Sequence, residues 1–115
     1  KEPMLNGLNQ IILHGIVKTR YRMIGETMNY KFNEDKSLQE LQAYIDGTYS
    51  EHYASDKYQA TDVIIDSGHG EGFAMGNIMK YAKRYGNKEG KNKKDLLKIL
   101  HYGIMMLDIH NKENQ

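Results

Sequence analysis

Residues 72–86 read GFAMGNIMKYAKRYG, and their periodicity is the strongest structural signal in the chain. At about 100° per residue, apolar side chains recur on one side of a helix. We expect that side to pack, and it comprises Ala74, Met75, Ile78, Met79, Ala82 and Tyr85. The opposite side carries an amide, two cations and a phenol, from Asn77, Lys80, Arg84 and Tyr81. The segment therefore predicts an amphipathic helix with one packed face and one face able to bind a ligand.

A second amphipathic segment follows after residue 94. Its apolar arc comprises Leu96, Leu97, Ile99, Leu100, Ile104 and Leu107. Asp95, Lys98 and Tyr102 lie across from that arc at helical spacing. Residues 86–92 between the two helices are polar and contain two glycines. We therefore predict a mainly α fold whose core is an antiparallel helical hairpin, residues 72–111.

Positive charge is concentrated on this hairpin. Residues 80–98 hold eight Lys or Arg side chains and two acids, whereas the whole chain has a net charge of +1, so the remainder is acidic. A basic unit on an acidic body focuses a positive field that suits a small polyanion better than a nucleic-acid duplex. A solvated lysine-rich surface explains the same charges equally well.

Composition bounds the class of protein. A length of 115 residues supports one domain, residues 1–115. No apolar run approaches the roughly 18 residues that span a membrane, and Ile11-Ile12-Leu13 is too short for a signal peptide. Without cysteine, the chain has no disulfide framework and no thiolate site. We expect a cytoplasmic protein with no membrane partner.

The N-terminal part allows two interpretations. Alternating side chains on both sides of residues 24–27 predict a β-hairpin. A helix over residues 8–24 competes, because Leu8, Ile12, Gly15 and Thr19 share a helical row, although its glycines weaken it.

The middle of the chain contains one clear helix signal. Ser37-Leu38-Gln39-Glu40 matches a capping box, and Gly47 is typical of a helix end, so we predict a helix over residues 38–46. Residues 48–60 lack a clear period, and a connector is the default interpretation. Residues 61–66 are a short apolar run that fits a strand or a helix.

Glycines precede the first amphipathic helix, in Ser67-Gly68-His69-Gly70-Glu71-Gly72. The dinucleotide fingerprint is excluded because Phe73 occupies the place of its third glycine, and no Gly-Lys-Ser/Thr forms a phosphate loop. We expect these glycines to turn the chain sharply and to bring backbone N–H groups to a helix start at Phe73, a place that can hold an anion.

Four motifs support a family resemblance. They are His52-Tyr53, Asp62-Val63-Ile64, the G-F-x-x-G-N-x-x-K-Y-x-x-R-x-G-x-K run from Gly72 to Lys88, and Asp95-Leu96-x-Lys98-x-x-x-Tyr102. In these motifs the chain resembles a family of small bacteriophage proteins labelled nucleotide kinase-like or of unknown function. The likeness covers roughly residues 50–110. The chain departs from the family pattern at Tyr85 and in Gly68-His69-Gly70.

The resemblance implies a helical fold, which favours helix over strand at residues 61–66, and a homo-oligomer in the cytoplasm of the host cell. It implies a nucleotide-handling part, residues 50–112, behind a chain-specific part, residues 1–49. One branch of the family transfers phosphate to deoxynucleoside monophosphates without a Walker loop. Carried over by position, the ligand contacts are His52, Asn77, Lys80, Arg84, Lys88, Asp95 and Lys98.

The same residue types suit phosphate chemistry. Arg84 can hold a phosphate through two parallel N–H bonds, and Lys80, Lys88 and Lys98 add point charges. Asn77 can contact a base or ribose, and Tyr53, Tyr81 or Tyr102 can stack on a ring. His52 is a candidate base or phosphate contact. The alternative role of each cation is that of a solvated surface charge.

The acidic residues are harder to assign. Asp95 can orient Lys98, hold Mg²⁺ with a nucleotide, or favour the start of its own helix, and we favour the last of these. Asp62 and Asp66 are spaced for a divalent site, a spacing that is also common by chance. No histidine pair has a metal-binding spacing, so no metal site is assigned.

Three functions remain. One is a nucleoside monophosphate kinase-like enzyme, whose catalytic residues the sequence leaves unknown. Another is a protein that sequesters a nucleotide or cyclic nucleotide as an anti-defence sponge. The third, nucleic-acid binding by the basic loop, is disfavoured because little of the surface is basic.

Overall fold

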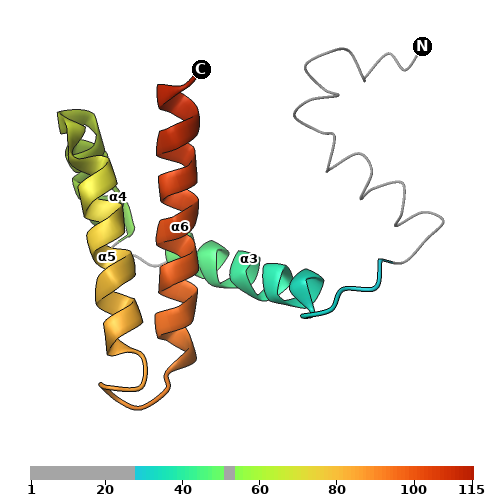
Figure 1. The fold of residues 1–115 in the computed structure, drawn as a ribbon. Helices are drawn as coiled ribbons and strands as arrows, with labels where there is room; N and C mark the ends of the chain where they lie inside the picture. The colour runs from blue at the N-terminus through green and yellow to red at the C-terminus, as the bar shows by residue number, and fades with distance from the viewer. Residues whose placement is uncertain (1–27, 51–53) are drawn as a thin grey trace, which may run out of the picture. The chain divides into compact units, whose positions relative to one another are not determined.

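The computed structural model describes residues 28–50 and 54–115, and these residues are mainly helical (Figure 1). The elements are α3 (Glu34–Ser50), α4 (Ala54–Ile64), the π-helical turn η1 (Ile65–His69), α5 (Gly70–Arg84) and α6 (Lys93–Glu113). By their contacts, Lys1–Asp35 and Lys36–Gln115 form two separate units, and the candidate site lies within the second. The mainly α prediction is confirmed. The alternative hairpin or helix near the N-terminus rests largely on residues outside the described part.

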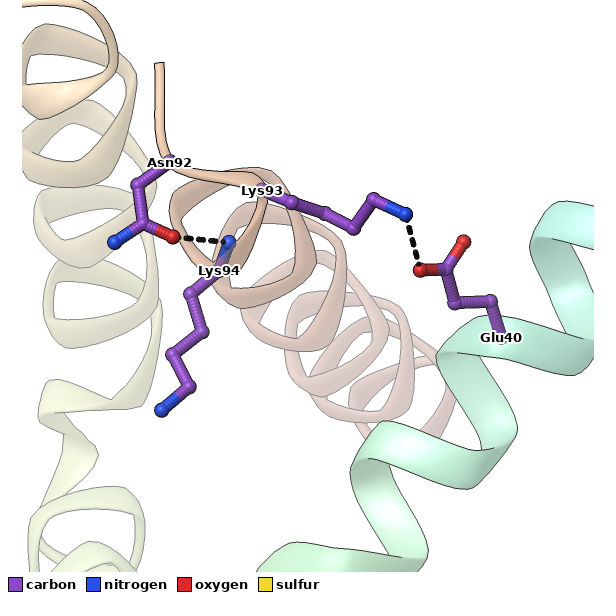
Figure 2. Close-up of polar contacts among 4 residues, drawn as sticks. All are labelled: Glu40, Asn92, Lys93 and Lys94. Carbon is purple, nitrogen blue, oxygen red and sulfur yellow. Dashed lines mark hydrogen bonds and ion pairs between the residues drawn. The ribbon is translucent and has the colours of Figure 1, made fainter. Parts of the chain in front are cut away.

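The α5–α6 hairpin is present as predicted, with its two helices antiparallel and side by side (Figure 1). The connecting loop is closed by the Gly86 N–H, which donates to the Gly90 carbonyl over 2.9 Å. Asn92 caps α6, since its side-chain oxygen accepts from the Lys94 backbone N–H over 2.9 Å (Figure 2). The loop therefore sets both the reversal of the chain and the first turn of α6.

The packed face of α5 is rotated from the predicted one. Ala74 is only 1% exposed, as expected, but Met75 and Met79, expected to pack, are 44% and 66% exposed. Tyr81 and Arg84, expected to face outward, are half-buried. Ala74 has a small side chain, which lets α6 approach α5 closely at that position. The buried face of α5 therefore contains Ala74 and the neighbouring aromatic rings rather than the methionines.

The packed face of α6 is also different from the predicted one. Its buried residues are Asp95, His101 and Ile109. Leu96, Leu100, Ile104 and Leu107, from the predicted packed arc, are 41–59% exposed. An amphipathic pattern shows that a helix has an apolar face, but not which face packs within the chain. In α6 the face that contains Asp95 and His101 packs against the neighbouring helices. Within the described residues, α6 therefore leaves an apolar row exposed.

Helix α3 is longer than predicted at both ends. Ser37 lies inside it, so the predicted capping box is wrong, and Gly47 does not end it. Gly47 inside the helix costs about 1 kcal/mol. The neighbouring Thr48 offsets this cost, because it is buried and its hydroxyl hydrogen-bonds to the Ile45 carbonyl over 2.7 Å and to the Tyr58 hydroxyl.

The segment before α5 is helical rather than a connector. Residues 54–60, for which a connector was the default, belong to α4, so that interpretation is wrong. Residues 61–66 are helical, as the resemblance implied, at the end of α4 and the start of η1. Tertiary contacts such as the Thr48–Tyr58 bond stabilise this weakly periodic sequence as a helix.

The predicted glycine turn is present, but α5 begins at Gly70 rather than at Phe73. Gly68 has φ 92°, a left-handed conformation that breaks the helix between η1 and α5. Gly70 is buried, and a Cβ added there would lie 3.0 Å from Ile109 Cδ1 and 3.1 Å from Ile65 Cγ1. The missing side chain therefore lets η1, α5 and α6 meet.

Candidate anion-binding site

Two tyrosines join the helices of the hairpin. Tyr81 of α5 and Tyr102 of α6 stack with ring centroids 6.2 Å apart and planes 13° from parallel. Phe73 meets Tyr102 edge-on, at 5.8 Å and 76°. Such aromatic pairs contribute about 0.5–1.5 kcal/mol beyond their buried area. We call Tyr81 and Tyr102 the tyrosine platform.

Three cations gather over this platform. Lys80 Nζ lies 4.6 Å, Arg84 Cζ 5.2 Å and Lys98 Nζ 5.4 Å from the centroid of the Tyr81 ring. Two come from α5 and one from α6, so the hairpin itself brings them together. Each is close enough for a cation–π attraction, about 0.5–1 kcal/mol where the charge stays exposed. Lys80, Arg84 and Lys98 are the cation cluster.

No carboxylate within 4 Å neutralises the cation cluster in residues 28–50 and 54–115. The ion pairs found there are Lys93–Glu40, at 2.8 Å (Figure 2), and Lys112–Asp108, at 2.9 Å. Neither pair includes a member of the cluster. Like charges held together gain free energy when an anion binds between them.

Lys98 stays protonated at neutral pH. Burial alone would lower the pKa of its ammonium, but the neighbouring phenols of Tyr44, Tyr81 and Tyr102 raise that pKa above its usual value. Burial and the neighbouring Tyr81 raise the pKa of Tyr102, against the opposing effect of Lys98. Lys98 therefore keeps its positive charge beside a neutral Tyr102 phenol at neutral pH.

Asp95 lies in the first turn of α6, where a negative charge meets the positive end of the helix dipole. It is 3% exposed, and its Oδ2 has no hydrogen-bond partner within the described residues. No ion pair joins it to Lys98 in that part of the chain. A buried carboxylate oxygen without a donor is costly, so this atom can still accept from a bound group.

The other predicted contacts are placed less centrally. Asn77 is half-buried, and its Nδ2 donates to the Phe73 carbonyl of its own helix over 2.9 Å, which leaves its amide oxygen available. Lys88 is an exposed loop residue whose backbone N–H donates to the Arg84 carbonyl over 3.0 Å. His52 and Tyr53 lie outside the described residues. The structure thus brings together Lys80, Tyr81, Arg84, Lys98 and Tyr102.

Sequence reasoning missed three aromatic contributors. Tyr44 of α3 helps to raise the pKa of Lys98, Phe73 meets Tyr102 edge-on, and the His101 ring lies edge-on to Tyr44 with centroids 6.1 Å apart. The signal for Tyr44 is the excess of tyrosine, nine against two phenylalanines, which indicates aromatic contacts without locating them. Helical spacing on α6 would have placed His101 beside Lys98.

Among the helices of residues 28–50 and 54–115, none combines the length and apolar character that crossing a bilayer requires. The same residues contain no group of three or more His, Asp or Glu side chains placed to hold a metal ion.

Comparison with known proteins is informative for only part of the chain. No curated protein and no solved structure matches it. One family model matches residues 48–103, which include the tyrosine platform and the cation cluster. That family carries no assigned activity, so the nucleotide kinase-like part of the resemblance stays a prediction. Residues 48–103 are therefore similar to a family described as a protein of unknown function, DUF3310.

Proposed function

We propose that the α5–α6 hairpin binds a nucleotide, with the cation cluster holding its phosphates. The observation that carries this proposal is the convergence of Lys80, Arg84 and Lys98 on one tyrosine ring. No ion pair within the described residues neutralises them. A phosphate group supplies the missing negative charge and several acceptor oxygens.

The three cations are suited to different parts of a polyphosphate. Arg84 offers a planar fork for two oxygens of one phosphate, whereas Lys80 and Lys98 act as point charges. Lys80 is exposed and Arg84 half-buried, so a ligand can reach both from solvent. The tyrosine platform adds aromatic surface beside the charges, on which a base can stack with a gain of about 1–3 kcal/mol.

Two activities fit such a site. Phosphoryl transfer depends mainly on positioning and on compensation of charge on the phosphate oxygens, which the cluster offers. This kinase-like activity also needs a carboxylate to bind Mg²⁺ or to accept a hydroxyl proton, and Asp95, whose buried Oδ2 has no partner among the described residues, is the candidate for that role. The alternative is sequestration of a nucleotide or cyclic nucleotide, in keeping with the resemblance to bacteriophage proteins of the host cytoplasm.

The binding test is calorimetric titration of the full chain with deoxynucleoside mono- and triphosphates and with the matching nucleosides. Arg84→Ala should weaken nucleotide binding by about ten- to a hundredfold, since hydrogen bonds to charged groups contribute about 1.5–3 kcal/mol. Lys83→Ala is the matched control, an exposed cation of the same helix that is not over Tyr81. Equal affinity for nucleosides and nucleotides would overturn the proposal.

Chromatography of the ligand after incubation then separates the two activities. A monophosphate incubated with a triphosphate and Mg²⁺ and recovered as a diphosphate shows the kinase-like enzyme. A ligand that binds stoichiometrically and is recovered intact, with every nucleotide pair tried, shows sequestration.

We also propose that the chain is a homo-oligomer. Leu96, Leu100 and Leu107 form an exposed apolar row along α6, which we call the leucine stripe. An uncovered row of this kind is typical of a helix face that packs against another subunit, and the resemblance implies the same. A second copy of the chain, pairing its own leucine stripe, would cover it.

A further inference from the structure

A second candidate site lies outside the cation cluster. A cavity of about 320 Å³ is lined by residues of α3, α4, η1 and α6, and no member of the cluster or of the platform lines it. Its size is within the range of small-molecule sites in proteins. Because its residues differ from those of the proposed nucleotide site, its ligand must be argued separately.

The floor of this cavity is apolar. Ile45 of α3, Ile65 of η1 and Met105 of α6 line it, and all three are half-buried. Tyr49 and Tyr58 add one wall, stacked at 4.6 Å and 13°. Tyr58 is held by the buried Thr48 hydroxyl, and Lys57 Nζ lies 5.7 Å from its ring centroid. The floor and wall suit a short aliphatic or aromatic body.

Two carboxylates, Asp62 of α4 and Asp108 of α6, give the cavity its charge. A cation of the chain already pairs with one of them, because Lys112 Nζ lies 2.9 Å from Asp108 Oδ2. The hydrogen bond to Asp108 and the charge of Asp108 raise the pKa of Lys112, and the charges of Asp62 and Asp66 raise it further. Both partners of the pair are well exposed, and exposed pairs of this kind are weak. An ammonium from outside the chain can therefore compete with Lys112.

His101 gives the cavity a buried acceptor. It is 8% exposed, and no hydrogen bond of its imidazole is found among the described residues. Burial, together with Lys57 and Lys98, lowers its pKa below the usual value, so the ring is neutral at neutral pH. A neutral imidazole has one nitrogen that accepts a hydrogen bond.

We propose that this cavity binds a small organic amine. Its ammonium lies between Asp62 and Asp108, and its aliphatic or aromatic body lies on Ile45, Ile65 and Met105. A donor on the body can reach His101. The acidic cavity selects against the phosphates that suit the cation cluster, so the two sites bind ligands of opposite charge.

The first test compares tryptamine with indole-3-propionate, which keeps the indole and replaces the ammonium by a carboxylate. Calorimetry or ligand-observed NMR on the full chain should show saturable binding of tryptamine and at least tenfold weaker binding of the acid. Putrescine tests whether an aliphatic body suffices. Equal binding of tryptamine and the acid, or no saturable binding of either amine, would overturn the proposal.

The second test uses variants that move the affinity in opposite directions. Asp62→Asn and Asp108→Asn should each weaken tryptamine binding by about tenfold, whereas Lys112→Ala should strengthen it because the carboxylate of Asp108 is released. Asp56→Asn is the control, an exposed acid of α4 that does not line the cavity. All four side chains are exposed, so folding should survive, as circular dichroism can check. An unchanged affinity in Asp108→Asn or Lys112→Ala would refute the proposed ammonium position.

Discussion

The rings of Tyr81 and Tyr102 stack across the hairpin, and this single contact both joins α5 to α6 and forms the surface on which the cation cluster lies. The candidate site is thus part of the helix contact. Substitutions at the platform should affect stability and ligand binding together, whereas substitutions in the cluster should affect mainly binding.

Tyr81→Phe should leave nucleotide affinity within about twofold, because the phenyl ring keeps both the stack on Tyr102 and the cation contacts. Tyr81→Ala removes that ring and should weaken binding by about tenfold or more and lower the unfolding free energy by about 3 kcal/mol. Titration calorimetry and urea denaturation measure the two effects. A Tyr81→Ala chain that binds as tightly as the native chain would show that the platform is not needed.

Gly70→Ala should destabilise the chain by about 1–3 kcal/mol, because the added methyl group meets Ile109 and Ile65 at close range. Gly76→Ala is the matched control in the same helix, where a Cβ meets nothing within 4 Å. The control should be stabilised by up to about 1 kcal/mol through helix propensity. Urea unfolding at 25 °C measures both, and equal effects at the two positions would contradict the close packing.

Asn92→Ala should cost about 0.5–2 kcal/mol of stability, because α6 loses the side-chain acceptor for the Lys94 N–H. Asn92→Asp keeps an acceptor at the helix start and should recover most of that loss. Thermal unfolding followed by circular dichroism compares the three chains. A loss shared by both variants would indicate that the amide, rather than its capping oxygen, matters.

Acid should destabilise the chain through His101. Its pKa in the folded chain is lowered by burial and by Lys57 and Lys98, so the unfolded chain binds more protons below the usual value of about 6.5. The unfolding free energy should therefore fall as the pH drops through that value and level off below the folded pKa. Tyr44, Tyr58, Asp62 and Asp108 also face this region from α3, α4 and α6.

Urea midpoints at pH 7 and pH 5 test this prediction. His101→Gln should remove most of the pH dependence over that interval, whereas His110→Gln, at an exposed position near the end of α6, should retain it. A pH dependence unchanged by His101→Gln would assign the effect to other groups.

Leu100→Gln should shift the chain toward monomer if the leucine stripe is the subunit contact. Light scattering coupled to size-exclusion chromatography should show a lower mass for this variant than for the native chain. Val63→Gln, which changes an exposed apolar residue of α4, is the control and should leave the mass unchanged. A native chain that is monomeric throughout would refute the proposed homo-oligomer.

Periodicity predicted the hairpin because two amphipathic segments separated by a polar loop have few other ways to pack. It failed to predict which faces meet. Met75, Met79 and Leu100 were expected inside and are exposed, while Asp95 and His101 are buried. The contact depends on the small residues Gly70 and Ala74 and on ring shapes, none of which hydrophobicity measures.

The candidate site was predictable in part for the same reason. Lys80, Tyr81 and Arg84 share one face of a helix, and Lys98 and Tyr102 share a face of the next, so spacing alone placed each set. That the two sets converge on one ring depends on the rotation of each helix. The contribution of Tyr44 depends on a third helix whose ends the sequence misplaced.

His101 lines the acidic cavity, and its ring lies 6.5 Å from the ring of Tyr102, so the two candidate sites are neighbours along α6. The imidazole is packed between opposite electrostatic environments, one attracting cations and the other anions. If either ligand shifts α6, the other site should change its affinity. Titrations of one ligand in the presence of the other should therefore show an energetic coupling between the two sites.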